Sequence, residues 1–332
     1  MIRKITYVES MTTSPYKNLA MEEYLLFHCA EDECILYLWQ NEKTVVIGKN
    51  QNAWKECYVS RLEEDGGHLV RRLSGGGAVF HDLGNLNFTF LTRSNHYDVK
   101  KQTQIIVDAL KKIGICATSS GRNDILVDGK KVSGNAYFKQ GDFCYQHGTL
   151  MIDVDVNQLS KYLNVPKDKL ESKGIKSVRS RVGNLKDYLP EITVSLVKEK
   201  LLESFEETFG IKAEYKSGDH LDKKEMEDYE TKYASWEWRC GRKMEFQYEL
   251  SHRFDWGNIS ILLQVDSGKI VDVDVYSDAM YIEIFSEIKK YLKGIPYSKK
   301  SICAELSLCW SVNKEEEKLL GDIVAWIENV DL

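Results

Sequence analysis

The sequence has no long hydrophobic run and no excess of basic residues. No stretch approaches the about 18 apolar residues of a membrane-spanning helix, and the amino terminus, MIRKITYVES, lacks the apolar segment of a secretion signal. A formal net charge of −6 argues against the broad basic face that binds nucleic acid. We therefore expect a soluble, cytoplasmic protein with no membrane or nucleic-acid partner.

Metal-ligand spacing is also absent from the sequence. The eight cysteines are scattered and form neither a CxxC pair nor a Cys/His cluster. In a chain without an export signal, such cysteines are expected to be reduced and to pack as small hydrophobic residues. A cysteine-ligated metal centre and a disulfide framework are therefore not expected.

The most informative stretch that is present runs from Arg71 to Phe90, RRLSGGGAVFHDLGNLNFTF. Three glycines in a row lose much backbone entropy on ordering, so they favour a place that needs positive φ or backbone contact with a ligand. Exposed amides of Gly75 to Gly77, with Arg71 and Arg72 beside them, predict a phosphate or carboxylate site. A tight turn with solvated arginines is the alternative. The missing GK[ST] and GxGxxG patterns exclude a P-loop and a dinucleotide fingerprint.

The periodicity of apolar residues predicts an α+β chain, with Ser14 and Pro15 as N-cap and first residue of the first helix. Helices are predicted at 15–27, 102–113, 157–162, 194–209, 281–292 and 314–329. Strands are predicted at 35–39, 44–48, 68–73, 87–91, 125–127, 131–132, 246–254, 257–265 and 269–275. The charged stretch 219–232 is either a solvated helix or a connection.

A change in pattern after Trp238 predicts two domains. The chain of 332 residues is long enough for a large domain and a small one. Three strand-like runs followed by helical runs indicate a small α+β domain from residue 248. We predict domains at 1–247 and 248–332.

A hairpin is predicted around Asp128-Gly129, which places Lys131 just beyond the turn. A lysine in a hairpin is usually a solvated charge. Because neighbours on a strand point to opposite faces, Lys130 is expected to face solvent. The segment His147-Gly148-Thr149 can be interpreted simply as the start of a buried strand.

The stretch RRLSGGGAVFHDLGN resembles the signature of the lipoate-protein ligase A family, which has RR-x-SGGGAVFHDLGN. Three further segments resemble that family in the same order: TVVIGKNQNAWKE at 44–56, GRNDILVDGKKVSGNAY at 121–137, and HGTLMIDVDVNQLSKYLN with KSVRSRVGNL between 147 and 185. With the carboxy-terminal third, the resemblance covers nearly the full length. It implies a large mixed-sheet catalytic domain of the biotin/lipoate ligase type and a small α+β accessory domain.

The resemblance implies an acyl-adenylating ligase. Lipoate, ATP and Mg²⁺ would give lipoyl-AMP and pyrophosphate, because a carboxylate is a poor acyl donor until it is activated. The lipoyl group would then pass to a lysine of a carrier, namely the lipoyl domains of 2-oxoacid dehydrogenase acyltransferases or the glycine cleavage H protein. In relatives, the accessory domain supports adenylation and swings away for transfer.

The resemblance also implies the site residues. Lys131, the second lysine of DGKKVSGNA, would hold both the acyl carboxylate and the α-phosphate. Asp124 would bind Mg²⁺ or act as a base. The implied binding residues are Arg72, Ser74, Gly75, Gly76, Gly77, Ala78, His81, Asn123, Asp124, Ser133, Gly134, Ala136, His147 and Arg181.

Two further features are hypotheses of the same kind. The loop SVRSR, Ser177 to Arg181, is a candidate lid over the nucleotide. The candidate walls of an apolar slot for the acyl tail are Val46, Ile47, Leu73, Val79 and Phe88.

Structural readings and rival functions stay open beside this one. Asn123 and Asp124 also suit an Asx-turn, and His81 and His147 suit structural hydrogen bonds. An ATP-independent octanoyl or lipoyl transferase would use a cysteine thioester, for which Cys144 is the candidate. A biotin ligase is disfavoured because its GRGRxG-type loop is missing. A non-catalytic binding module would keep the glycines but have no use for Lys131.

Overall fold

The computed structural model describes residues 1–121, 124–164, 182–217, 221–241, 244–311 and 313–330. The chain divides into two compact units, which are described separately. Unit 1 consists of residues 1–46, 56–71 and 79–239, and unit 2 of residues 47–55, 72–78 and 240–332. Within the described residues, every helix is too short or too polar to traverse a bilayer.

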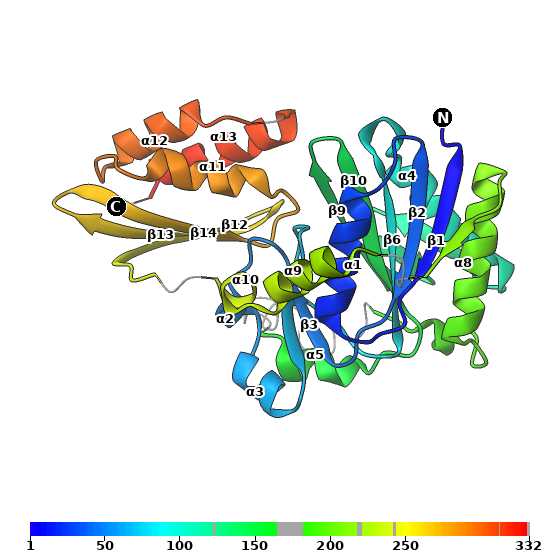
Figure 1. Cartoon of the computed structure of the whole chain (residues 1–332). Coiled ribbons are helices and arrows are strands. Elements are labelled where there is room, and N and C mark those ends of the chain that lie inside the picture. Colours follow the sequence, from blue (N-terminus) through cyan, green and yellow to red (C-terminus); the bar gives the residue numbers. More distant parts are fainter. Residues whose placement is uncertain (122–123, 165–181, 218–220, 242–243, 312, 331–332) are drawn as a thin grey trace. The chain divides into compact units, whose positions relative to one another are not determined.

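Unit 1 is built on an eight-stranded mixed sheet (Figure 1) in the order β11-β1-β2-β6-β10-β9-β8-β7. Its strands are β1 Lys4–Glu9, β2 Glu33–Trp39, β6 Asn85–Arg93, β7 Ala117–Ser120, β8 Asp124–Val127, β9 Lys130–Gln140, β10 Phe143–Met151 and β11 Glu214–Lys216. β1 runs parallel to β2 and β11, and the other neighbours are antiparallel. A three-stranded sheet, β4-β3-β5, contains β3 Thr44–Ile47, β4 His68–Arg71 and β5 Val79–His81.

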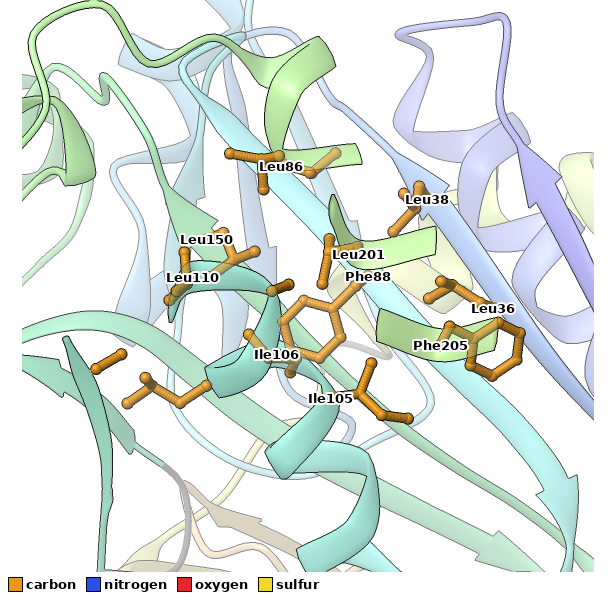
Figure 2. Close-up of a cluster of buried hydrophobic side chains, with 14 of the residues drawn as sticks. Leu36, Leu38, Leu86, Phe88, Ile105, Ile106, Leu110, Leu150, Leu201 and Phe205 are labelled. Carbon is orange, nitrogen blue, oxygen red and sulfur yellow. The ribbon is translucent and has the colours of Figure 1, made fainter. Parts of the chain in front are cut away.

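One face of the large sheet is covered by α4 (Val99–Lys112) and α8 (Val194–Phe209). Figure 2 shows the resulting core, in which Phe88 of β6 lies among side chains of both helices. Its labelled members are Leu36, Leu38, Leu86, Phe88, Ile105, Ile106, Leu110, Leu150, Leu201 and Phe205, all fully buried. Since side chains alternate along a strand, the residues between these core positions face the other way.

The opposite face receives α1 (Pro15–Phe27), whose Glu22 bonds to Thr89 of β6 and His147 of β10. α9 (Lys223–Ala234) packs on α1, and Lys232 Nζ donates to both carboxylate oxygens of Glu23, at 2.7 and 2.6 Å. The charged stretch after residue 219 therefore contains a packed helix. Among the described residues, the other helices outside the second unit's core are α2 Ala53–Glu56, α3 Val59–Glu64, η1 Ser94–His96, α5 Val156–Tyr162, η2 Leu185–Asp187 and α10 Trp236–Cys240.

Unit 2 contains an antiparallel sheet of β12 Tyr248–Phe254, β13 Gly257–Asp266 and β14 Lys269–Ser277. The helices α11 Glu283–Leu292, α12 Lys299–Leu308 and α13 Lys314–Glu328 lie together on one side of it (Figure 1) and share one apolar core with it. The α+β character expected of the second domain is thus confirmed. The exact boundary at residue 247 remains a prediction.

Several predicted elements match closely, and the differences have local causes. The helices predicted at 15–27 and 194–209 are α1 and α8. α4 starts at Val99 rather than residue 102, because the Asp98 side chain accepts from the amide of Lys101 and caps it. α12 was not predicted. Its sequence, KKSICAELSL, is short, and only Ile302 and Leu306 are buried.

Phe205 offers a test of how much the core of unit 1 contributes to stability. It is fully buried in α8 and packs against Phe90 and Phe209. We expect Phe205→Ala to lower the free energy of unfolding by about 3–5 kcal/mol, because it removes the aromatic ring and leaves a cavity. Leu83→Ala, at a site 53% exposed, should cost about 0.5 kcal/mol or less. Urea unfolding followed by circular dichroism measures both, and equal losses would contradict the prediction.

Candidate functional site

The β8–β9 hairpin places Lys131 beside Asp124. The turn residues Asp128 and Gly129 both have positive φ, 49° and 77°, as the two-residue turn requires. Lys131 Nζ lies 2.7 Å from Asp124 Oδ1, and each side chain is 39% exposed. Lys130 is exposed, as predicted. The ammonium is thus held by a carboxylate yet reachable from solvent.

This pair lies on the face of the sheet that also carries His147. Asp124 is opposite Gly134, and Ala136 is opposite His147, so the four residues share one face with Lys131. It is the face away from the α4–α8 core. The predicted residues Lys131, Asp124, Gly134, Ala136 and His147 are therefore brought to one side of three adjacent strands.

A buried polar chain connects the two predicted histidines. His147 Nδ1 is 2.9 Å from Glu22 Oε1, Thr89 Oγ1 donates to the same oxygen at 2.6 Å, and Trp39 Nε1 donates to Thr89 at 3.1 Å. The ring of His81 lies edge-on to Trp39, with centroids 6.2 Å apart. All five side chains are at least nine-tenths buried. Because a buried network of this kind fixes its members' rotamers, it holds both histidines in place.

Glu22 is one of three members of this network, with Thr89 and Trp39, that the sequence analysis missed. Glu22 is 1% exposed, and its partners explain this burial, because charged residues are almost never buried unless they are paired. The sequence did contain a sign that Glu22 is buried. In NLAMEEYLLF, Glu22 stands on the buried stripe of α1, four residues after the buried Asn18.

The glycine stretch is organised by Arg72, within unit 2. The Arg72 guanidinium donates to Ser74 Oγ at 3.0 Å, Gly75 O at 2.7 Å and Gly77 O at 2.8 Å. Arg72 is only 6% exposed. In this structure the guanidinium holds the loop's own oxygens, and its expected contact with an anion stays a prediction.

The glycines make close backbone contacts with the residues that directly follow β14. The amide of Gly76, whose φ is 87°, donates to Ala279 O at 3.0 Å. A Cβ at Gly75 would lie 2.6 Å from Ala279 O and 2.7 Å from Met280 O, so no larger residue fits. The sequence predicted either positive φ or contact of a ligand with the backbone; Gly76 has positive φ, and atoms of the protein itself contact the backbone. The expectation that all three amides are exposed is wrong for Gly76.

Arg71 belongs to unit 1 and bonds to the end of α10. Its guanidinium donates to the carbonyls of Trp238, at 2.8 Å, and Arg239, at 2.9 Å, while Trp238 Nε1 donates back to Arg71 O. It therefore ties β4 to α10. The expected place of Arg71 beside a bound anion stays a prediction.

The other predicted residues have varied positions. Ser133 is fully buried opposite Ile125 of the core, and Ala78 is half-buried. Phe88, a candidate wall of the acyl slot, belongs instead to the core against α4 and α8. Val46, Ile47 and Leu73 are buried, and Val79 is half-buried. Asn123 and the loop Ser177 to Arg181 lie outside the described residues.

The donor set for a metal ion is small. Among the described residues, no three His, Cys, Asp or Glu side chains form a group that could hold a metal. Mg²⁺ usually binds through substrate phosphates and one or two carboxylates, so a single carboxylate such as Asp124 fits such an ion. A protein-only metal centre is not formed by the described part of the chain.

The environment of Cys144 opposes a nucleophilic role. The residue is fully buried in β10, and burial raises the pKa of its thiol to about 11. At pH 8 such a thiol is ionised in about one molecule in a thousand, and the thiolate is the reactive form. Cys144 thus has the chemistry of a core residue.

Comparison with known proteins gives two family matches. Residues 14–206 match the family described as lipoyl protein ligase A/B catalytic domain, and residues 243–327 match bacterial lipoate protein ligase C-terminus. Lipoate-protein ligase A of Psychrobacter cryohalolentis is 38% identical over 98% of this chain and 98% of its own. Lipoate-protein ligase A of Blochmanniella pennsylvanica is 40% identical over 94% of this chain and 95% of its own.

Similar solved structures also include lipoate ligases. LipL1 of P. falciparum in complex with lipoate has a TM-score of 0.86 and 31% identity, over 98% of this chain and 100% of that one. A lipoate-protein ligase A bound with ATP has a TM-score of 0.62 and 26% identity, over 73% and 99%. A bipartite lipoate protein ligase, reported with its E2 lipoyl domain from Thermoplasma acidophilum, has a TM-score of 0.64 and 28% identity, over 74% and 99%.

Alkylation tests the burial of Cys144. We expect iodoacetamide at pH 8 to modify the exposed Cys116 within minutes and to leave Cys144 unmodified in the native protein, because its thiol is buried and protonated. Peptide mass spectrometry measures both sites. The same treatment in urea, where both thiols are exposed, is the control. Rapid native labelling of Cys144 would contradict the assignment.

Proposed function

The chain belongs to the lipoate-protein ligase A family, and we propose from this premise how its residues perform the reaction. The enzyme is an ATP-dependent ligase that activates lipoate as lipoyl-AMP and transfers the lipoyl group to a lysine of a carrier domain. The observation on which the residue assignment rests is the half-exposed Lys131–Asp124 pair, on the same sheet face as the buried His147–Glu22 pair.

Lys131 would provide the positive charge for the first half-reaction. The lipoate carboxylate and the α-phosphate of ATP repel each other as they approach, and an ammonium between them lowers that repulsion. The carboxylate oxygen attacks the α-phosphorus, and pyrophosphate leaves. The Lys131 side chain is 39% exposed, which is compatible with this role because both anions must reach the ammonium.

The buried polar chain would shape the site rather than transfer protons. His147 and His81 are fixed through Glu22, Thr89 and Trp39, so their ring positions do not depend on a ligand. A fixed wall orients a bound acid before it reacts, and preorganisation of this kind lowers the entropic part of the barrier.

Arg72 would act on the nucleotide through the glycine loop. Carbonyl oxygens repel an anion, and Arg72 satisfies those of Gly75 and Gly77. The loop can then present amide dipoles to phosphate without opposing carbonyls. When Mg²⁺ is bound with ATP, it neutralises phosphate charge, and Asp124 is the described carboxylate that would hold it.

The second half-reaction transfers the acyl group to a protein. The ε-amine of a carrier lysine attacks the acyl carbon of the mixed anhydride, and AMP leaves. We propose lipoyl domains of 2-oxoacid dehydrogenase acyltransferases and the glycine cleavage H protein as carriers. The E2 lipoyl domain reported with the T. acidophilum ligase supports the first class. The use of ATP supports a cytoplasmic reaction.

The thioester route is less well supported. It needs a thiolate nucleophile that a substrate can reach, and Cys144 is fully buried with a pKa raised to about 11. Adenylation uses no cysteine. The burial of Cys144 therefore favours the ATP-dependent reaction.

Lipoate-dependent exchange of pyrophosphate into ATP tests the assignment of Lys131. We expect wild-type protein to catalyse the exchange and Lys131→Ala to lose it by a factor of about 100 or more, because the charge between the two anions is gone. Lys130→Ala, on the exposed neighbour, is the matched control and should retain activity. An active Lys131→Ala protein would remove Lys131 from the site, and an inactive wild type would contradict the adenylation reaction.

A truncated chain ending at Phe246 tests the role of the accessory domain. We expect it to lose most lipoate activation, because Gly75 and Gly76 lose their contacts with Ala279 and Met280. Transfer from supplied lipoyl-AMP to a lipoyl domain should be affected less. Circular dichroism and gel filtration control for folding. Equal impairment of both steps in a folded chain would mean that the domain only supports the structure.

A further inference from the structure

A register shift in the β8–β9 hairpin lies directly beside Lys131. Ile125 is opposite Ser133, whereas the next residue, Leu126, is opposite Lys131. Val132 is therefore the extra residue of a β-bulge, and Val132 and Ser133 are both fully buried. Bulges commonly change the direction of a side chain next to a functional site.

The bulge decides which face of the sheet Lys131 occupies. In a regular strand, residues 131 and 134 lie on opposite faces, because side chains alternate. The extra residue brings Lys131 to the face of Gly134, and Asp124, opposite Gly134, shares it. Without the bulge, Lys131 would point to the side of the apolar core, where an ammonium has no place.

The missing side chain of Gly134 makes room for the lysine on that face. A Cβ at Gly134 would lie 3.0 Å from both Cε and Nζ of Lys131, which is closer than carbon contacts normally come. The φ angle of Gly134 lies outside the positive region, so the glycine is not required by the backbone. Its use at this position is space for the end of the lysine.

Two contacts fix the two ends of Lys131. The backbone is held between strands, since Leu126 is its partner on one side and Val182 on the other, and the amide of Gly183 donates to Lys131 O at 3.0 Å. The ammonium is held by Asp124 at 2.7 Å. The side chain thus spans the surface of Gly134 between two fixed points.

We propose that Gly134 is a positioning residue that acts through Lys131. The bulge at Val132 turns the lysine to the reactive face, the bare backbone of Gly134 lets it lie flat, and Asp124 holds the ammonium until a ligand anion replaces the carboxylate. This proposal rests on the proposed function of Lys131. Any side chain at position 134 displaces the ammonium from the place where the two anions meet.

A double-mutant cycle with lipoyl-AMP as the ligand tests this proposal. We expect Gly134→Ala to weaken lipoyl-AMP binding and to slow ATP–pyrophosphate exchange severalfold, because even a small displacement of the ammonium is costly at a reacting centre. In the Lys131→Ala background, the same substitution should change lipoyl-AMP affinity by less than about twofold, since the residue that it displaces is gone. Calorimetry measures affinity in all four proteins.

The outcomes separate the possible roles of Gly134. An equal loss in both backgrounds would mean a general structural defect and would overturn the proposal, as would unchanged affinity and exchange for Gly134→Ala alone. A wild type without lipoate-dependent exchange would instead overturn the proposed function. Gly321→Ala in α13 is the matched control, because its Cβ meets open space and its φ is not positive.

Asp124→Asn provides a second test if Gly134→Ala does not fold. It keeps the shape of the side chain but removes the charge that holds the ammonium. We expect an amine-reactive acetylating reagent to modify Lys131 several-fold faster in this variant, with Lys130 unchanged as the internal control. Peptide mass spectrometry measures both rates. Unchanged labelling of Lys131 would overturn the proposed clamp.

Discussion

The site of unit 1 depends on the alternation of side chains along its central strands. Phe88 and Thr89 are neighbours on β6, yet Phe88 packs in the apolar core and Thr89 bonds to Glu22 on the other face. The core face is apolar enough to hold α4 and α8, and this leaves the second face available for polar groups. The bulge at Val132 interrupts this alternation and adds Lys131 to that second face. Packing and chemistry are therefore separated by one sheet, with few residues serving both.

Local signals in the sequence were sufficient for elements whose cause is also local. Ser14-Pro15 marked the start of α1, Asp128-Gly129 marked the hairpin, and both lie where they were predicted. The long-range choices had no such signal. Arg72 can bind a phosphate or a carbonyl equally well, and only the fold shows that its donors go to Ser74, Gly75 and Gly77. The bulge beside Lys131 is likewise set by pairing with β8, which a single strand does not reveal.

For the glycine stretch, the sequence predicted a close contact with the backbone but not the residues that make it. Three glycines indicated that something must touch the backbone, and Gly75 and Gly76 do have atoms close to their backbone. Those atoms belong to Ala279 and Met280, which lie about 200 residues further along the chain. No sequence motif indicates that these residues contact the glycines. Gly48 has the same character, since a Cβ there would collide with Gly76 O. The family resemblance identified the glycine loop, and the structure shows which residues contact it.

The buried cysteines have a consequence for the substrate itself. Lipoate carries a strained cyclic disulfide, and thiolates open such rings by thiol–disulfide exchange. Burial raises the pKa of Cys29 to about 12 and of Cys144 and Cys309 to about 11, so these sulfurs stay protonated in neutral solution. A protonated thiol is a poor attacking group. These buried cysteines are therefore kept from becoming covalently attached to the enzyme's own cargo, whereas the exposed Cys116 lacks the protection that burial gives.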